Sequence, residues 1–220
     1  MKSELFQHIS KYLHAQKEIK HALKGHEVKV KKPEFNITIQ NIVSSINLFT
    51  SIDLVEIYQR LIDDESIDIS YNPDKFPGVI LKIKNPKVSS LVFNSGKLVL
   101  TGAKTTENVR IGVKTISELL KKVGVVITEE PEIVIQNIVA SGNFNHKQLN
   151  LELIALWLDH SMYEPEQFPG LIFRLEKPKN VLLLFQSGNL VCTGGRSEKQ
   201  VHEAVAKTYE LLEEINAFEL

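Results

Sequence analysis

The sequence predicts an α+β protein made of two copies of one unit that pack about a pseudo-twofold axis. The stretch at residues 71–104 returns at residues 163–196 with many positions unchanged. A shorter motif, Gln-Asn-Ile-Val, precedes both stretches and begins at Gln40 and at Gln136. One unit of roughly 90 residues is therefore written twice, and two joined copies of one fold usually pack symmetrically.

Residues 1–32 form a basic extension that precedes the two units. Apolar residues recur at helical spacing over residues 3–24, Ser3 is a candidate N-cap and Gly25 follows the last periodic residue, so we expect an amphipathic helix. The extension carries eight Lys and three Glu, a balance of +5. Three roles stay open for it: a loosely packed tail, a helix that binds a partner, or an additional clamp on a ligand surface.

The two units, taken as residues 33–128 and 129–220, show the same order of elements. Each begins with a strand of alternating apolar and polar residues, continues with an amphipathic helix and several strands joined by tight turns, and ends with a longer helix. The predicted strands are residues 35–43, 79–84, 90–93, 98–101, 133–139, 171–176, 181–185 and 190–193. The predicted helices are residues 54–62, 106–123, 149–158 and 197–214.

The two units differ in length at one place. The offset between them is 96 residues at Asn41 and Asn137 but 92 residues at Tyr71 and Tyr163. The first unit therefore carries about four additional residues, which we interpret as an acidic surface loop at residues 63–68.

Apolar strands in the middle of each unit indicate a sheet face that the helices leave uncovered. The segments VSSLVF and VLLLF are apolar at nearly every position, which is typical of strands with apolar cover on both faces. The two helices of each unit can cover only one face, because both connect on the same side. The other face would expose Val, Leu and Phe, and such a patch usually marks a binding surface.

Charge and composition limit the function classes. The first unit has eleven basic and ten acidic residues and the second has seven basic and fourteen acidic residues, so the balances are +1 and −7. A domain held on nucleic acid mainly by phosphate neutralisation would be basic, so any such binding has to depend on other contacts. No apolar run reaches the length of a membrane span and no signal-peptide core begins the chain, so we expect an intracellular protein without membrane contact.

Metal, redox and catalytic chemistry have little support in the sequence. The single cysteine, Cys192, lies in an apolar strand-like run, where a buried residue is expected rather than a nucleophile. The histidines of the extension do not have the spacing of a metal-ligand set. An enzyme alternative, the substrate-binding half of a nuclease or glycosylase, lacks a Ser-His or Cys-His arrangement, a carboxylate cluster or a phosphate loop. We therefore expect no cofactor, no metal and no enzyme activity.

The duplicated motifs carry a family resemblance that covers nearly all of residues 35–215. Gln-Asn-Ile-Val, the turns YNPDKFPG and YEPEQFPG, the segments LVFNSGK and LLFQSGN, and the strand ends LTGAK and CTGGR resemble those of the TATA-binding protein family. YEPEQFPG followed by CTGGRSE is more similar to the archaeal form than to the eukaryotic one. The resemblance implies a saddle of ten antiparallel strands, with four helices on the convex side and a concave apolar sheet that sits on the minor groove of DNA.

The same resemblance implies two pairs of aromatic wedges, Phe76 with Phe93 and Phe168 with Phe185. Each pair would enter one end of the DNA site, because an inserted ring replaces a lost base stack. Core packing is the alternative for these residues. It fits poorly at Phe76 and Phe168, which stand before Pro-Gly turns.

Asn41 and Asn137 match the central pair of the family, and an amide there can donate to adenine N3 or thymine O2 in the minor groove. A turn or cap is the alternative for an isolated asparagine, but the duplication in identical context argues against it. The implied base-contacting residues are Asn41, Asn137, Thr101, Thr193, Val43, Val139, Val99, Val191, Leu91 and Leu183.

Exposed cations are candidates for phosphate contacts, although surface Lys and Arg are commonly just solvated. The second unit would hold phosphate less firmly, because Gln167 replaces Lys75 and Asn189 replaces Lys97. The candidates are Lys75, Lys82, Lys84, Lys97, Arg174 and Arg196.

The turn containing Glu164 and Glu166 resembles the loop with which the family contacts transcription factor B, ordinary loop solvation being the alternative. The function implied is a general transcription initiation factor that binds an A/T-rich promoter box, bends it and recruits transcription factor B and RNA polymerase. Such a protein would be cytoplasmic and nucleoid-associated in an archaeon, or nuclear in a eukaryote. A second hypothesis is a paralogue whose sheet is masked by a protein partner, by the extension or by a homodimer contact.

Overall fold

The computed structural model describes residues 35–219, and both predicted repeats are present there with the same order of elements. Repeat 1 contains β1 (Thr38–Asn47), α2 (Leu54–Leu61), β2 (Ile67–Ser70), β3 (Val79–Ile83), β4 (Val88–Val92), β5 (Lys97–Ala103) and α3 (Thr106–Lys122). Repeat 2 contains β6 (Glu132–Asn143), α4 (Leu151–Trp157), β7 (Ser161–Met162), β8 (Leu171–Leu175), β9 (Asn180–Leu184), β10 (Asn189–Gly195) and α5 (Glu198–Glu214). The predicted two-copy α+β architecture is confirmed.

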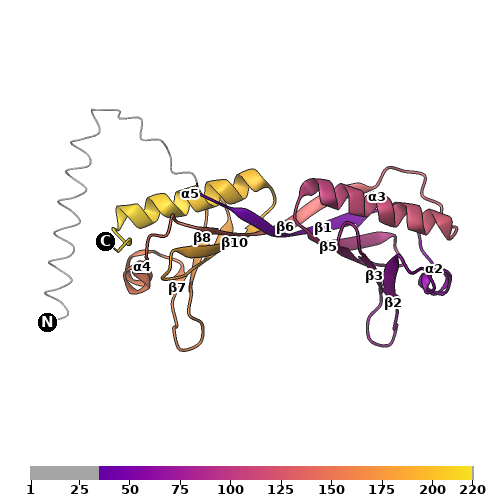
Figure 1. The fold of residues 1–220 in the computed structure, drawn as a ribbon, viewed down its shortest axis with the longest axis horizontal. Coiled ribbons are helices and arrows are strands. Elements are labelled where there is room, and N and C mark those ends of the chain that lie inside the picture. Colours follow the sequence, from indigo (N-terminus) through magenta and orange to yellow (C-terminus); the bar gives the residue numbers. More distant parts are fainter. Residues whose placement is uncertain (1–34, 220) are drawn as a thin grey trace, which may run out of the picture.

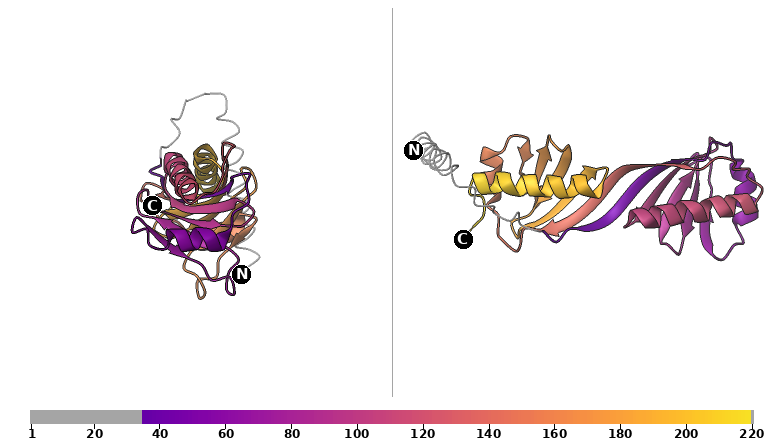
Figure 2. Two further views of the ribbon diagram at one scale, coloured as in Figure 1. Left: turned by 90° about the vertical axis from the view of Figure 1, so that its right-hand side faces the viewer. Right: turned by 90° about the horizontal axis from the view of Figure 1, so that it is seen from above.

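The ten strands form one continuous antiparallel sheet in the order β2-β3-β4-β5-β1-β6-β10-β9-β8-β7. β1 and β6 pair at the centre, so the two repeats share a single sheet. The long helices α3 and α5 lie along one face, while α2 and α4 stand at the two outer ends (Figure 1). The loops at residues 71–78 and 163–170 project from the two ends past the opposite face, and the molecule is long and narrow (Figure 2). We call the sheet face opposite α3 and α5 the open face.

A capping side chain begins each of the four helices within residues 35–219. Asp53 and Asn150 cap α2 and α4, and Thr105 and Ser197 cap α3 and α5, each accepting a hydrogen bond from a backbone N–H of the first turn. Each long helix then packs one apolar stripe against the sheet. Along residues 35–219, no helix is long and apolar enough to cross a membrane.

Strand residues alternate between a buried side and a half-exposed side. Leu81 in β3, Val92 in β4 and Leu100 in β5 point toward the helices and are fully buried. The residues that alternate with these buried ones along each strand are half-exposed or exposed and lie on the open face. The same alternation occurs in β8, β9 and β10. The predicted apolar face that the helices do not cover is therefore confirmed.

The segment interpreted as an acidic loop contains a strand, so that interpretation was wrong in part. Ile67 begins β2 and is buried, and β2 and its counterpart β7 form the two edges of the sheet. Only the turn before β2 is a loop, where Ser66 donates from its N–H and its hydroxyl to the Asp64 carboxylate and lowers the pKa of that group. Strands of four and two residues are too short to show the alternation on which the prediction depended.

Two further details differ from the predictions. β1 and β6 do not end at Val43 and Val139 but continue to Asn47 and Asn143, so the Gln-Asn-Ile-Val motif lies within each strand. The short helices stand at the ends of the sheet rather than along its face (Figure 1). The helix predicted over residues 3–24 lies outside the described residues.

An aromatic cluster closes the outer end of repeat 2. Phe35, Phe144, Tyr209 and Phe218 pack with ring centroids between 4.8 and 6.0 Å apart. Lys147 Nζ lies 4.8 Å from the Phe218 ring centroid and 2.6 Å from the Tyr209 hydroxyl. The cluster attaches the start of the described chain to its end.

Candidate nucleic-acid interface

Two asparagine–threonine pairs lie at the centre of the open face, one in each repeat. Asn41 Nδ2 lies 3.1 Å from Thr101 Oγ1, and Asn137 Nδ2 lies 3.1 Å from Thr193 Oγ1. The partners are 60 and 56 residues apart in sequence, and the sheet brings them together. All four side chains are half-exposed, so they are available to a ligand on this face.

Backbone donors fix which end of each amide faces outward. Gly102 N–H donates to Asn41 Oδ1 at 2.8 Å, and Gly194 N–H donates to Asn137 Oδ1 at 2.7 Å. Because a backbone N–H can only donate, each amide oxygen has to face it and each amide nitrogen remains a donor. One Nδ2 hydrogen is directed to the threonine, which leaves the second for an acceptor on a ligand.

The central ladder interleaves the two repeats. Asn41 pairs with Val139, and Val43 pairs with Asn137, so each amide lies next to a valine of the other repeat. These four predicted contact residues therefore form a single patch across the pseudo-twofold axis.

An apolar row continues from the centre to each end of the open face. In repeat 1 the register places Leu91 beside Val99 and also beside Ile80, which the sequence analysis did not select. The counterparts in repeat 2 are Leu183, Val191 and Ile172.

A phenylalanine pair stands at each end of this row. The rings of Phe76 and Phe93 have centroids 5.9 Å apart at 59°, and those of Phe168 and Phe185 are 5.9 Å apart at 65°. All four are half-exposed. The rings therefore lie at the surface, where the wedge hypothesis requires them.

Gly78 and Gly170 make room for these rings. A Cβ atom at Gly170 would lie 2.7 Å from Phe168 Cε1 and 2.9 Å from Phe185 Cε1, and one at Gly78 would lie 2.9 Å from Phe76 Cε1. Such distances are below van der Waals contact, so any other residue would displace the pair. The Pro-Gly sequences that predicted turns thus also seat the aromatic rings.

Gln40 and Gln136 are polar residues of the central patch that the sequence analysis missed. Each falls at a register shift of the β1–β6 ladder, where it is the extra residue of a bulge. Gln40 Nε2 donates to Ser141 Oγ and Gln136 Nε2 donates to Ser45 Oγ, both at 2.7 Å. Their presence in the duplicated motif was the available signal.

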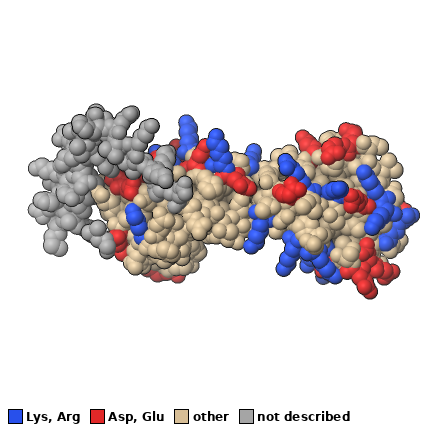
Figure 3. All heavy atoms as spheres, turned by 45° about the horizontal axis from the view of Figure 1, so that its top comes forward, with Lys and Arg blue, Asp and Glu red and all other residues tan. Residues whose placement is uncertain are grey.

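The predicted phosphate-contacting cations, Lys75, Lys82, Lys84, Lys97, Arg174 and Arg196, are all exposed. Lys84 Nζ donates to the Glu65 carbonyl at 2.7 Å, so this cation is engaged within the protein. On the face that carries the helices, cations and carboxylates are interspersed (Figure 3). The described part of that face does not form a basic tract.

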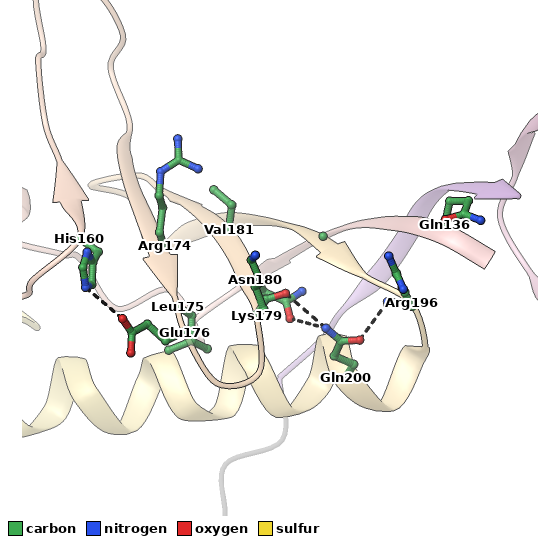
Figure 4. Close-up of a pocket in the computed structure, with 11 residues that line it drawn as sticks. Gln136, His160, Arg174, Leu175, Glu176, Lys179, Asn180, Val181, Arg196 and Gln200 are labelled. Atoms are coloured by element: carbon green, nitrogen blue, oxygen red, sulfur yellow. Dashed lines mark hydrogen bonds and ion pairs between the residues drawn. The ribbon is translucent and has the colours of Figure 1, made fainter. Parts of the chain in front are cut away.

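Two hollows adjoin the predicted contacts. Arg174 and Arg196 line a hollow of 850 Å³ in repeat 2, together with Lys179, a cation that the sequence analysis did not select (Figure 4). Lys97 lines a hollow of 750 Å³ in repeat 1, next to Phe93.

Glu164 and Glu166 are exposed on the loop that projects from the end of repeat 2 (Figure 1). The Glu164 carbonyl accepts hydrogen bonds from the N–H groups of Gln167 and Phe168, so the backbone of the turn is fixed without the two carboxylates. Both side chains are therefore exposed to solvent on a fixed turn.

The described residues contain no group of three or more side chains that could hold a metal ion. Cys192 is buried, as predicted, and burial raises the pKa of its thiol to about 11. A thiol of this kind is chemically inert at neutral pH.

The fold and the open face define a class: a two-repeat saddle with a long, twofold ligand-binding surface that has amide donors at its centre and aromatic pairs at its ends. The sequence matches the family described as transcription factor TFIID (or TATA-binding protein, TBP) over residues 36–123 and 132–215. The chain belongs to this family of non-enzymatic, DNA-binding transcription initiation factors.

Individual relatives agree with the family match. The TATA-box-binding protein of Pyrobaculum aerophilum is 48% identical over 177 residues, covering 80% of this chain and 86% of the relative. That of Pyrodictium occultum is 46% identical over 186 residues, covering 84% and 90%. The solved structure described as Methanococcus jannaschii TBP superposes with a TM-score of 0.72 at 41% identity, covering 84% of this chain and 99% of that one. The chain is thus of the archaeal type.

Proposed function

We propose that this TATA-box-binding general transcription factor seats its open face on the minor groove of an A/T-rich promoter box. The observation that carries the proposal is the repeated arrangement of Asn41 with Thr101 and Asn137 with Thr193 between two apolar rows. Duplex DNA is itself nearly twofold symmetric, so such a surface can meet both halves of a site in the same way.

The central amides favour A·T over G·C base pairs. In the minor groove A·T pairs present only the acceptors adenine N3 and thymine O2, whereas G·C adds the guanine amino donor. Asn41 and Asn137 each offer an amide nitrogen, because Gly102 and Gly194 hold the oxygens. Against guanine, donor would face donor and both groups would stay unpaired.

The phenylalanine pairs act as wedges at the two ends of the site. An apolar ring inserted at a base step costs a few kcal/mol of unstacking, a general cost for minor-groove wedge proteins, this family among them. The glycines beneath Phe76 and Phe168 keep the rings at the surface, and their half-exposed positions make apolar area available to the bases. The resulting kinks let the curved sheet contact more of the groove.

Apolar contact carries a larger share of the binding than phosphate neutralisation. Repeat 2 has seven basic and fourteen acidic residues. Among the six predicted cations Lys84 is the weakest candidate, because its ammonium is bonded to the Glu65 carbonyl.

The loop with Glu164 and Glu166 is the docking point for transcription factor B, which then brings in RNA polymerase. Two exposed carboxylates on a fixed turn suit a basic partner surface. The protein itself performs no chemical step in this scheme.

A mobility-shift titration of the full-length protein tests the proposal, with an A/T-rich box, a G/C box of equal length and added transcription factor B. We expect preference for the A/T box, and a salt slope of roughly −5 over about 50 to 200 mM, since five or six phosphate contacts contribute about −0.9 each. A supershift with transcription factor B should follow. Equal affinity for the two boxes, or a slope near −10, would contradict the proposal. Binding delayed by dissociation of a homodimer would instead favour the hypothesis of a masked sheet.

A further inference from the structure

The open face is closely similar in the two repeats, but the residues behind it are not. Asn180, at the start of β9, is a buried amide that is 2% exposed. Its counterpart in repeat 1, 92 positions earlier, is Val88. A buried amide is tolerated only when its polar atoms are hydrogen-bonded.

A chain of hydrogen bonds satisfies Asn180. Its Nδ2 donates to the Thr193 carbonyl at 3.1 Å, and its Oδ1 accepts from Gln200 Nε2 at 3.1 Å. Gln200, in the first turn of α5, also donates to the Lys179 carbonyl at 3.3 Å and accepts from Arg196 N–H at 3.0 Å (Figure 4). The start of α5 is thereby bonded to the backbone of β10.

Thr193 connects this series of hydrogen bonds to the open face. Its backbone carbonyl receives Asn180, and its hydroxyl bonds Asn137, the central amide of repeat 2. In repeat 1 the side chain of Val88 has no polar atom, so the equivalent link to Thr101 cannot form. The two central amides are thus held by different supports.

We propose that Asn180 and Gln200 are positioning residues that hold Thr193 and Asn137, and that they make repeat 2 the stricter of the two halves in selecting A·T over G·C. The proposal rests on the proposed minor-groove function. A donor held rigidly cannot shift to relieve a clash with a guanine amino group, whereas a less constrained one can. The difference gives a nearly symmetric protein a preferred orientation on its site.

The first test needs no DNA. Gly194 N–H bonds Asn137 Oδ1 and Gly102 N–H bonds Asn41 Oδ1, so hydrogen exchange of these two glycine amides reports on the two supports in the full-length protein. We expect Gly194 to exchange about threefold to tenfold more slowly than Gly102, as for one additional hydrogen bond. Asn180→Val should remove the difference. Equal exchange in the wild type, or no change in the variant, would overturn the proposal whatever the protein binds.

The second test measures base selection under each repeat. Ser95 is exposed in a repeat 1 turn, so Ser95→Cys can carry a DNA-cleaving label that reports orientation. Cys192 is buried and will not compete for the label. Affinities are then measured for boxes with a single G·C pair under repeat 1 or under repeat 2.

Two variants separate positioning from general stability. Asn180→Val breaks the link at its centre, while Gln200→Glu keeps an acceptor for Arg196 N–H but removes the donors to Asn180 and Lys179. Each should lower discrimination under repeat 2 by about threefold to tenfold and leave repeat 1 unchanged. A matched packing control, Val88→Ala, should not alter the ratio between the halves. An equal loss of discrimination under both repeats would show a merely structural role and overturn the proposal. A wild-type protein without A/T preference would instead contradict the proposed function.

Discussion

Repeat 1 and repeat 2 present closely similar open faces but differ in the side chains at their outer ends and in their charge. The half-exposed pattern of β3, β4 and β5 recurs in β8, β9 and β10. In contrast, the outer end of repeat 2 is closed by Phe144, Tyr209 and Phe218, where the corresponding residues of repeat 1 are Leu48, Ser117 and Val126. The charge balances also differ, at +1 and −7.

The comparison shows which features the ligand surface depends on. Most side chains of the open face keep their type in both copies, as the proposed contact of both halves with chemically similar DNA requires, and Ser89 with Val181 and Lys97 with Asn189 are the exceptions in β4, β5, β9 and β10. The core can change from leucine to phenylalanine, since packing requires only filled volume. The net charge of the surface can also differ between the repeats, because only repeat 2 carries the loop proposed to dock transcription factor B. Each repeat can therefore serve as the experimental control for the other.

The largest expected effect concerns the projecting loops. Glu164→Arg with Glu166→Arg should abolish capture of transcription factor B, because reversing two charges against a basic surface costs several kcal/mol. DNA binding alone should stay intact or tighten. The matched control in repeat 1 is Asn72→Arg with Asp74→Arg, which should leave the ternary complex unchanged in a mobility-shift assay. Capture at wild-type concentrations by the repeat 2 variant would show that these carboxylates are merely solvated.

Removal of one wedge should affect one end of the site only. Phe168→Ala should weaken DNA binding by a few kcal/mol and reduce the bend at the repeat 2 end, and Phe76→Ala should do the same at the other end. Fluorescence energy transfer between labels placed at each DNA end measures the two bends separately. Unchanged bending in both variants would remove the wedge role.

The free energy of unfolding should respond more to side-chain truncation in the aromatic cluster of repeat 2 than at the corresponding end of repeat 1. Phe218→Ala should lower the free energy of unfolding by about 2 kcal/mol, because a half-buried ring and its aromatic contacts are lost. Val126→Ala should change it by less than about 0.5 kcal/mol, since Val126 is 70% exposed. Denaturant unfolding distinguishes them, and equal costs would mean that the cluster adds nothing.

The smallest effect expected is that of a single central amide. Asn137→Ala should weaken binding to an A/T box by about 1 kcal/mol, the value of one hydrogen bond. Asn137→Asp should be worse, because the carboxylate keeps the Gly194 contact but turns a second oxygen toward groove acceptors. Asn41 variants should follow the same order. An aspartate variant that binds as well as the alanine variant would contradict the donor role.

Much of the fold could be predicted because the same unit occurs twice in the sequence. The repeat established the two-copy architecture. Turn residues located β3, β4, β5, β8, β9 and β10 to within two residues, and the apolar–polar alternation located most of β1 and β6. The edge strands β2 and β7 were not predicted, because they are stabilised by pairing with β3 and β8 rather than by a pattern in their own sequence.

The site was less accessible from sequence. Residue types in the motifs indicated the phenylalanines and the central asparagines, but not what holds them in place. Gln40 lies in the central patch because of a bulge, and Asn180 is linked to that patch from behind only through its hydrogen bonds to Gln200 and Thr193. Both depend on strand register and helix placement, which single-residue preferences do not encode.

The central claim is that the open face recognises the minor groove. It is tested most directly by replacing every A·T pair of the box with inosine·cytosine, which lacks the guanine amino group and so presents A·T-like acceptors in the minor groove but a G·C-like pattern in the major groove. We predict that the full-length protein binds the inosine box nearly as well as the A/T box and binds the G/C box weakly. Binding to the inosine box as weak as that to the G/C box would contradict the account.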